Sequence, residues 1–161
     1  MATASRGMFY ESFSVGQVLE TPRRTITSTD IVNFACLSGD FNGVHADFEY
    51  CKSTPFSEPI AHAPLVYAVM GGLQYASGVN EGTLLAVLGI DEWRMHKPVK
   101  HGDTLHMRSI VLSKRETSKP DRGIVAFKRE FINQRGETVQ SMTATFMYKR
   151  QDQASPSTEG H

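Results

Sequence analysis

Apolar residues recur with helical spacing in the first half of the chain, beginning just after Thr27. The Thr27 hydroxyl can cap a first turn, and Asp30 three residues later completes a variant capping box at the positive end of the helix dipole. Gly39 is typical of a helix C-terminus. The pattern therefore predicts a helix that starts at Thr27 and stops at Gly39. Its apolar stripe comprises Ile31, Phe34, Ala35 and Leu37.

A second predicted helix opens at Pro64, a residue favoured in a first helical turn, and ends at Gly78. Between the two helices, residues 40–59 are expected to form a loop with a short helical turn over 47–52. The second helix is apolar on nearly every side, which predicts that it is buried. Its apolar residues are Leu65, Val66, Ala68, Val69, Met70, Leu73, Tyr75 and Ala76.

The second half of the chain has the pattern of strands. Extended segments are predicted at residues 18–26, 83–90, 92–97, 104–114, 124–133 and 137–150, with a hairpin connection at 133–136 that places Gly136 in the turn. Long antiparallel strands with one apolar helix predict an α+β architecture, a single curved sheet wrapped around a long central helix. Strand 137–150 has apolar residues in near-alternation, and we expect edge-to-edge pairing of two copies to form a homodimer.

Length and composition narrow the choice of protein class. A chain of 161 residues fits one domain, and 17 basic against 17 acidic residues argue against general nucleic-acid binding and against a membrane-surface protein. No segment predicts a membrane span, and the first six residues are not of signal-peptide type. Cys36 and Cys51 do not form a paired motif, which favours a reducing compartment and a cytoplasmic protein. We expect a flexible start at 1–8, a folded domain at 9–150 and a disordered tail at 151–161.

Two segments carry candidate chemistry. Asp40 and His45 lie five residues apart in a glycine-containing loop, and both groups can exchange protons near neutral pH when burial tunes them. Spacing alone leaves a turn-making or capping role open for both. At the second segment, the N–H of Ala63 and the dipole of the helix start can polarise a carbonyl group. For His62 we expect a helix cap or core packing.

His96, His101 and His106 lie close in sequence and are candidate ligands of a metal site. We expect them not to converge, because they fall on a turn and a strand and no cysteine joins them. We therefore expect no metal site.

Taken together, these segments resemble the MaoC-like dehydratase family, which includes (R)-specific enoyl-CoA hydratases. The resemblance runs from about Phe9 to Arg150 and rests on the order and spacing of short matching pieces. These are residues 10–16 with 24–25, 28–37, 38–45, 60–62, 97–99 with 102–105, and 133–137.

The resemblance implies a hot-dog fold over residues 9–150, dimeric or built from dimers. It implies a catalytic Asp40 and His45 with Asn42 between them, and a backbone N–H of Ala63 directed at a thioester carbonyl, beside His62. It further implies hydration of a 2-enoyl-CoA to a 3-hydroxyacyl-CoA with no separate cofactor, since CoA is part of the substrate. An apolar tunnel along the helix would hold the acyl chain, with Val66, Met70 and Leu73 as candidates, although ordinary core packing is the favoured role for each.

This chain departs from the family pattern at three positions. Gly43 stands where proline is usual, Ala63 where glycine is usual, and Ala68 where serine is common. Because of these departures, a non-catalytic acyl-CoA-binding or partner protein is one alternative function. An acyl-CoA thioesterase on the same fold is another, although the match to the hydratase loop argues against it.

Overall fold

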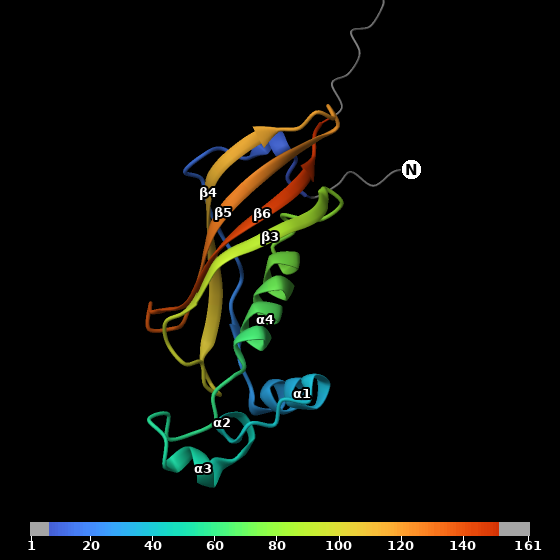
Figure 1. Cartoon of the computed structure of the whole chain (residues 1–161). Helices are drawn as coiled ribbons and strands as arrows, with labels where there is room; N and C mark the ends of the chain where they lie inside the picture. Colours follow the sequence, from blue (N-terminus) through green and yellow to red (C-terminus); the bar gives the residue numbers. More distant parts are fainter. Residues whose placement is uncertain (1–6, 152–161) are drawn as a thin grey trace, which may run out of the picture.

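A computed structural model describes residues 7–151 as one antiparallel sheet with helices at one face and one end (Figure 1). The elements in chain order are η1 (Tyr10–Ser12), β1 (Val18–Glu20), β2 (Arg24–Thr25), α1 (Ser28–Ser38), α2 (Gly43–Ala46), α3 (Phe48–Lys52), α4 (Ala63–Ala76), β3 (Leu84–Met95), β4 (Thr104–Glu116), β5 (Arg122–Ile132) and β6 (Thr138–Lys149).

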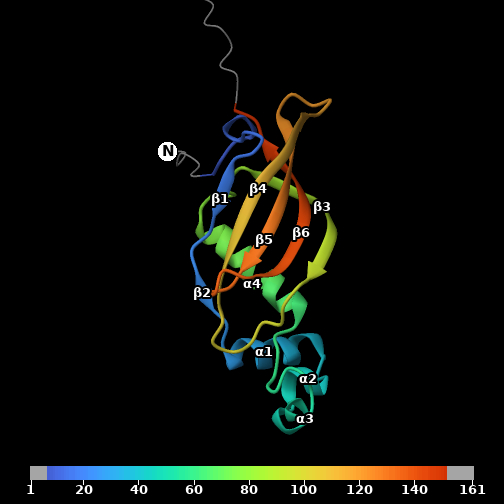
Figure 2. The same cartoon turned by 90° about the vertical axis from the view of Figure 1, so that its left-hand side faces the viewer.

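The sheet has the strand order β1-β4-β5-β6-β3, with β2 also paired to β4, and its neighbouring strands are antiparallel. It curves around α4, while α1, α2 and α3 gather at one end (Figure 1). Figure 2 shows the strands side by side with α4 behind them. The predicted α+β architecture, a hot-dog fold with a central helix wrapped by a curved antiparallel sheet, is confirmed.

The position of the sheet edge differs from the prediction. Strand β6 lies between β5 and β3, and the long edge strand is β3. The predicted segments 83–90 and 92–97 form this one strand, with register shifts and a positive φ of 52° at Glu92. The alternation in β6 marks a buried face, which packs with α4 at Met142 and with Tyr10 and Phe13 farther along the strand. Alternation distinguishes the two faces of a strand and says nothing about its edges.

Helix α4 presents one side to the sheet and leaves the other open. Leu65, Val66, Val69, Met70 and Leu73 are buried with residues such as Met107, Phe131 and Met142 of the sheet. The opposite side holds Ala68, Gly71, Gly72 and Tyr75, of which Tyr75 is 74% exposed. The expectation of a helix buried on all sides is therefore wrong for a single chain.

The N-terminal helix follows its sequence signals closely. Thr27 and Asp30 form the capping box, and Gly39 ends α1 in the left-handed conformation with a φ of 77°. Leu37 is the exception, since it is 83% exposed and does not join the apolar stripe. The following loop contains two short helices, α2 and α3, where one turn was predicted.

The ends of the folded part extend beyond the predicted domain. The N–H of Met8 donates to the carbonyl of Val79 at 2.8 Å, and the N–H of Gln151 donates to Glu11 Oε2 at 3.0 Å. Residues 7, 8 and 151 thus belong to the folded domain. The rest of the two predicted tails, 1–6 and 152–161, lies outside the described residues. Within the described chain, no helix has the length and apolar character needed to cross a membrane.

Candidate active site

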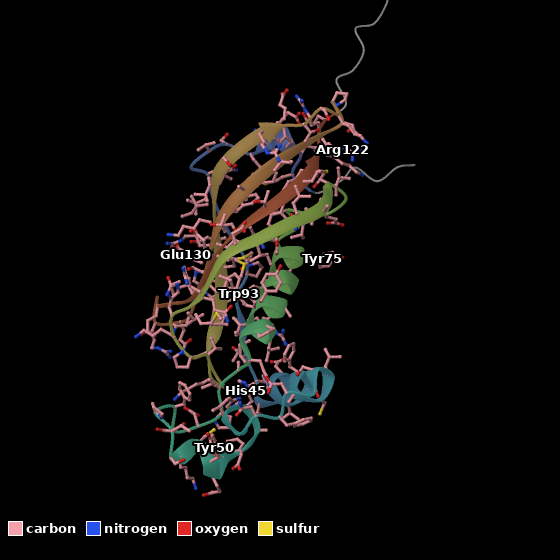
Figure 3. The ribbon with its side chains drawn as sticks, in the orientation of Figure 1. His45, Tyr50, Tyr75, Trp93, Arg122 and Glu130 are labelled. Carbon is pink, nitrogen blue, oxygen red and sulfur yellow. The ribbon has the colours of Figure 1, made fainter. Side chains whose placement is uncertain are left out.

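The loop between α1 and α2 brings a carboxylate and an imidazole together. Gly39 turns the chain out of α1, and the side chain of Asn42 caps α2, which carries His45 in its single turn. Asp40 Oδ2 then lies 3.9 Å from His45 Nε2. Figure 3 shows His45 near the start of α4, with Tyr50 farther out on α3. A separation of this size leaves room for one water molecule hydrogen-bonded to both groups.

The hydrogen bond made by Nδ1, the second ring nitrogen, determines the tautomer of His45. His45 Nδ1 lies 2.7 Å from the carbonyl oxygen of Ile60. A carbonyl only accepts hydrogen bonds, so Nδ1 must carry the hydrogen in the neutral ring. The lone pair of Nε2 therefore faces the carboxylate of Asp40. Ile60 is itself held by its N–H, which donates to the carbonyl of Val44 at 3.0 Å.

His62 belongs to the same cluster, although it precedes α4. Its side chain makes no capping hydrogen bond and is buried, so of the two expected roles the structure shows core packing and not a cap. The ring is 2% exposed and its Nε2–H donates to the backbone carbonyl of Asp40 at 2.9 Å. It stacks on His45 with a centroid separation of 3.7 Å and an interplanar angle of 25°. His62 thereby positions both Asp40 and His45, through contacts across 22 and 17 residues that no local pattern signals.

The three side chains also place possible metal donors together. One ligand atom from each of Asp40, His45 and His62 lies within 4.8 Å of the others. However, His62 Nε2 donates its hydrogen to a carbonyl, so it presents no lone pair to a cation. Of the earlier metal candidates, His96 contacts Ser141 and His101 accepts from the N–H of Ser28; within residues 7–151 they join no donor cluster.

The start of α4 forms one wall of a cavity next to this pair. The cavity has a volume of about 440 Å³, and its lining includes His45, Ala63, Val66, His96, Lys97, Gln140 and apolar neighbours. Ala63 is the first residue of α4, so its N–H has no acceptor within the helix. The N–H of Val66 makes the first helical bond, to His62, and Pro64 has no N–H. The backbone N–H groups of Ala63 and Leu65 are therefore the donors at this helix start that have no acceptor within the helix.

A buried glutamine that the sequence analysis missed fixes this helix start. Gln140 on β6 is 3% exposed, and its Nε2 donates to the carbonyl of Ala63 at 3.2 Å. Its Oε1 accepts from Trp93 Nε1 at 3.0 Å. A polar residue at an inward position of a strand is the sequence signal that could have identified it.

The sequence of this chain also matches a known family. The family described as "MaoC like domain" matches residues 12–129. The chain belongs to this MaoC-like family. It is 39% identical over 114 residues to Protein MaoC of Klebsiella aerogenes, a match that covers 71% of this chain and 33% of that protein.

Two solved structures resemble this MaoC-like chain along most of its length. One is described as a monoamine oxidase regulatory protein from Archaeoglobus, with 33% identity, a TM-score of 0.81, and coverage of 89% of this chain and 95% of that one. The other is an R-hydratase from Pseudomonas aeruginosa, with 33% identity, a TM-score of 0.72, and coverage of 89% and 87%. The first curated relatives are longer proteins, of which this chain spans 33% to 45%.

The structure explains one departure of this MaoC-like domain from the family pattern. A Cβ atom at Gly43 would lie 2.8 Å from Cδ1 of Tyr50, so a proline ring there would collide with the tyrosine. Asn42 still shapes the loop, because its Oδ1 accepts from the N–H of Val44 at 3.4 Å and its own N–H donates to Asp40 Oδ1 at 3.2 Å. These contacts support a turn-making role for Asn42.

The remaining candidate residues of the MaoC-like site separate into two groups. Val66 both packs in the core and lines the cavity, whereas Met70 and Leu73 pack in the core and do not line it. Lys97 lines the same cavity, and its Nζ lies 3.9 Å from Glu137 Oε1. Other lysines are engaged elsewhere, Lys100 with Glu58, Lys114 with the carbonyl of Phe13 and Lys128 with Glu130. His45 also borders a second, mostly apolar cavity of about 460 Å³ between α1 and α3.

Proposed function

We propose that this protein reversibly adds water to the double bond of a 2-enoyl-CoA thioester to give a 3-hydroxyacyl-CoA. The observation that carries the proposal is the pairing of the Asp40 carboxylate with the Nε2 lone pair of His45, 3.9 Å apart and next to the cavity at the start of α4. Two proton acceptors facing one water-sized gap suit the activation of water. The name of the R-hydratase that this chain resembles supports the same reaction class.

In the proposed mechanism Asp40 and His45 hold the reacting water between them. Asp40 removes one proton as the water oxygen attacks the β-carbon, while His45 Nε2 accepts a hydrogen bond and orients the water. The carbon–carbon π electrons move toward the thioester, and the α-carbon then takes up a proton delivered from the pair. One C–O and one C–H bond form as one O–H bond and the π bond break. No redox step occurs, and CoA enters with the substrate.

Negative charge gathers on the thioester oxygen during the attack. The free N–H of Ala63 and the positive end of α4 would stabilise this charge, because fixed donors aimed at a developing oxyanion need little reorganisation. Gln140 holds the Ala63 carbonyl and so fixes the direction of the first turn. Val66 would contact the enoyl chain, and Lys97 at the cavity would meet the negative charges of CoA.

The direct test is to incubate the purified protein with crotonyl-CoA. We expect loss of the enoyl absorbance and formation of a 3-hydroxyacyl-CoA, without release of free thiol. Release of CoA thiol without hydration would instead identify a thioesterase. Saturable binding without turnover across short, medium and branched enoyl chains would identify a non-catalytic binding protein, and either outcome would refute the proposal.

We also infer that the protein is a homodimer joined through β3. This strand is the long edge of the sheet, and over residues 84–90 it carries no charged side chain to prevent pairing. Leu85, Val87 and Leu88 are 40%, 51% and 45% exposed. Antiparallel pairing of two β3 strands would cover them and continue the sheet.

Light scattering after gel filtration tests the dimer. We expect a mass near twice the 17.9 kDa of one chain, and conversion toward one chain in a Leu88→Lys variant because the charge lies at the proposed interface. Leu112→Lys is the matched control, since Leu112 on β4 is also exposed, at 44%, away from that edge. A wild-type mass of one chain would contradict the inference.

A further inference from the structure

An arginine is buried on the inner face of the sheet, away from the candidate active site. Arg129 lies on β5, directly opposite Ser109 of β4, and is 3% exposed. Its guanidinium carbon lies 4.2 Å from the ring centroid of Phe146 and 6.0 Å from that of Phe127. These aromatic faces attract the cation but offer no hydrogen-bond acceptor of ordinary strength.

The guanidinium group of Arg129 has no anionic partner. Its Nε and Nη2 atoms are buried without a hydrogen-bond acceptor, and among the described residues no carboxylate pairs with it. Burial lowers the pKa of Arg129 to about 10, so the group still carries its charge at neutral pH. Burying an unpaired charge with unsatisfied donors is strongly unfavourable. We therefore expect an acceptor that carries negative charge to bind next to the guanidinium.

A small cavity adjoins Arg129 and offers space for such a partner. Its volume is about 20 Å³, and its lining includes Gln74, Ser77, Ser109, Tyr148 and further residues of β1, β4 and β5. Gln74 and Ser109 are buried, and neither side chain makes a hydrogen bond to another of the described residues. Glu20 also borders the cavity, but its carboxylate is bound to Arg108 Nε at 3.0 Å.

We propose that this cavity is a binding site for one small monovalent anion of halide size. The lining combines a cationic guanidinium with an amide and a hydroxyl that can donate. The volume suits a single particle about the size of a water molecule, which excludes phosphate, sulfate and organic acids. The site lies at the end of α4 that carries Gln74 and Ser77, and it shares no lining residue with the cavities beside His45.

The proposal predicts that halides stabilise the folded protein, because a ligand that binds only the native state raises the melting temperature. At equal ionic strength, we expect the wild-type Tm to be about 3–6 °C higher in sodium chloride or bromide than in sodium gluconate, whose anion is too large for the cavity. In Arg129→Met the difference in Tm between halide and gluconate should vanish. Lys128→Met, which removes an exposed cation of the same strand that does not line the cavity, should retain this difference.

A second measurement needs only the wild-type protein, so it stands even where Arg129→Met fails to fold. We expect saturable broadening of the chloride-35 NMR line by the native protein, reversed by bromide and abolished by unfolding. Equal Tm values in halide and gluconate together with no excess line broadening would show that the cavity holds water alone, and would overturn the proposal. Neither measurement depends on hydration activity, so the anion site and the proposed reaction are tested independently.

Discussion

Crotonyl-CoA hydration should fall by about 10²- to 10⁴-fold when Asp40 is replaced by Asn or His45 by Gln. Asp40→Asn removes the carboxylate that would take the proton of the attacking water. His45→Gln removes the Nε2 lone pair that faces this carboxylate at 3.9 Å. Both replacements are close in size to the original side chains, so the measured quantity is kcat, with circular dichroism to confirm that the fold is kept.

Two residues outside the site provide matched controls for these variants. Asp47→Asn changes a carboxylate that caps α3, and His106→Gln changes an imidazole on β4 that lines neither cavity beside His45. Neither contacts Asp40 or His45, and both variants should retain hydration activity within a few-fold. Wild-type kcat in Asp40→Asn or in His45→Gln would remove that residue from the proposed mechanism.

Ala63→Pro is expected to lower kcat/KM by about 10²- to 10³-fold, the cost of removing one oxyanion donor. This substitution deletes the N–H of Ala63 at the first position of α4, where proline is readily accommodated. His62 already has a ψ of 137°, the extended conformation that a following proline requires. The change therefore removes a hydrogen-bond donor with little disturbance of the helix start.

The glycine variant at the same position separates the donor from the side chain. Ala63→Gly restores the residue usual in the family and keeps the N–H, so we expect activity at least equal to that of wild type. A melting temperature close to wild type in Ala63→Pro, combined with undiminished kcat/KM, would show that this N–H does not stabilise the transition state. Equal losses in the proline and glycine variants would point to the methyl group instead.

Local sequence signals were sufficient for much of the fold. The capping pair of Thr27 and Asp30, the left-handed Gly39 and the proline after Ala63 each act within a few residues, so the pattern along the chain located both main helices. Helical and strand periodicities differ, so the α+β class followed as well. The segment with Asp40 and His45 was identified by its residue types and by its resemblance to a family.

Tertiary structure decided what depends on contacts between distant segments. Strand order placed β6 inside the sheet and β3 at its edge, which alternation along one strand does not encode. Pairing across the fold set His62 against Asp40 and His45, and Gln140 against the start of α4. The sequence by itself determined the elements and the chemical groups of the site, because these follow from local propensity and residue type. Only the folded chain determined which groups meet, because burial and long-range hydrogen bonds arise when remote segments pack together.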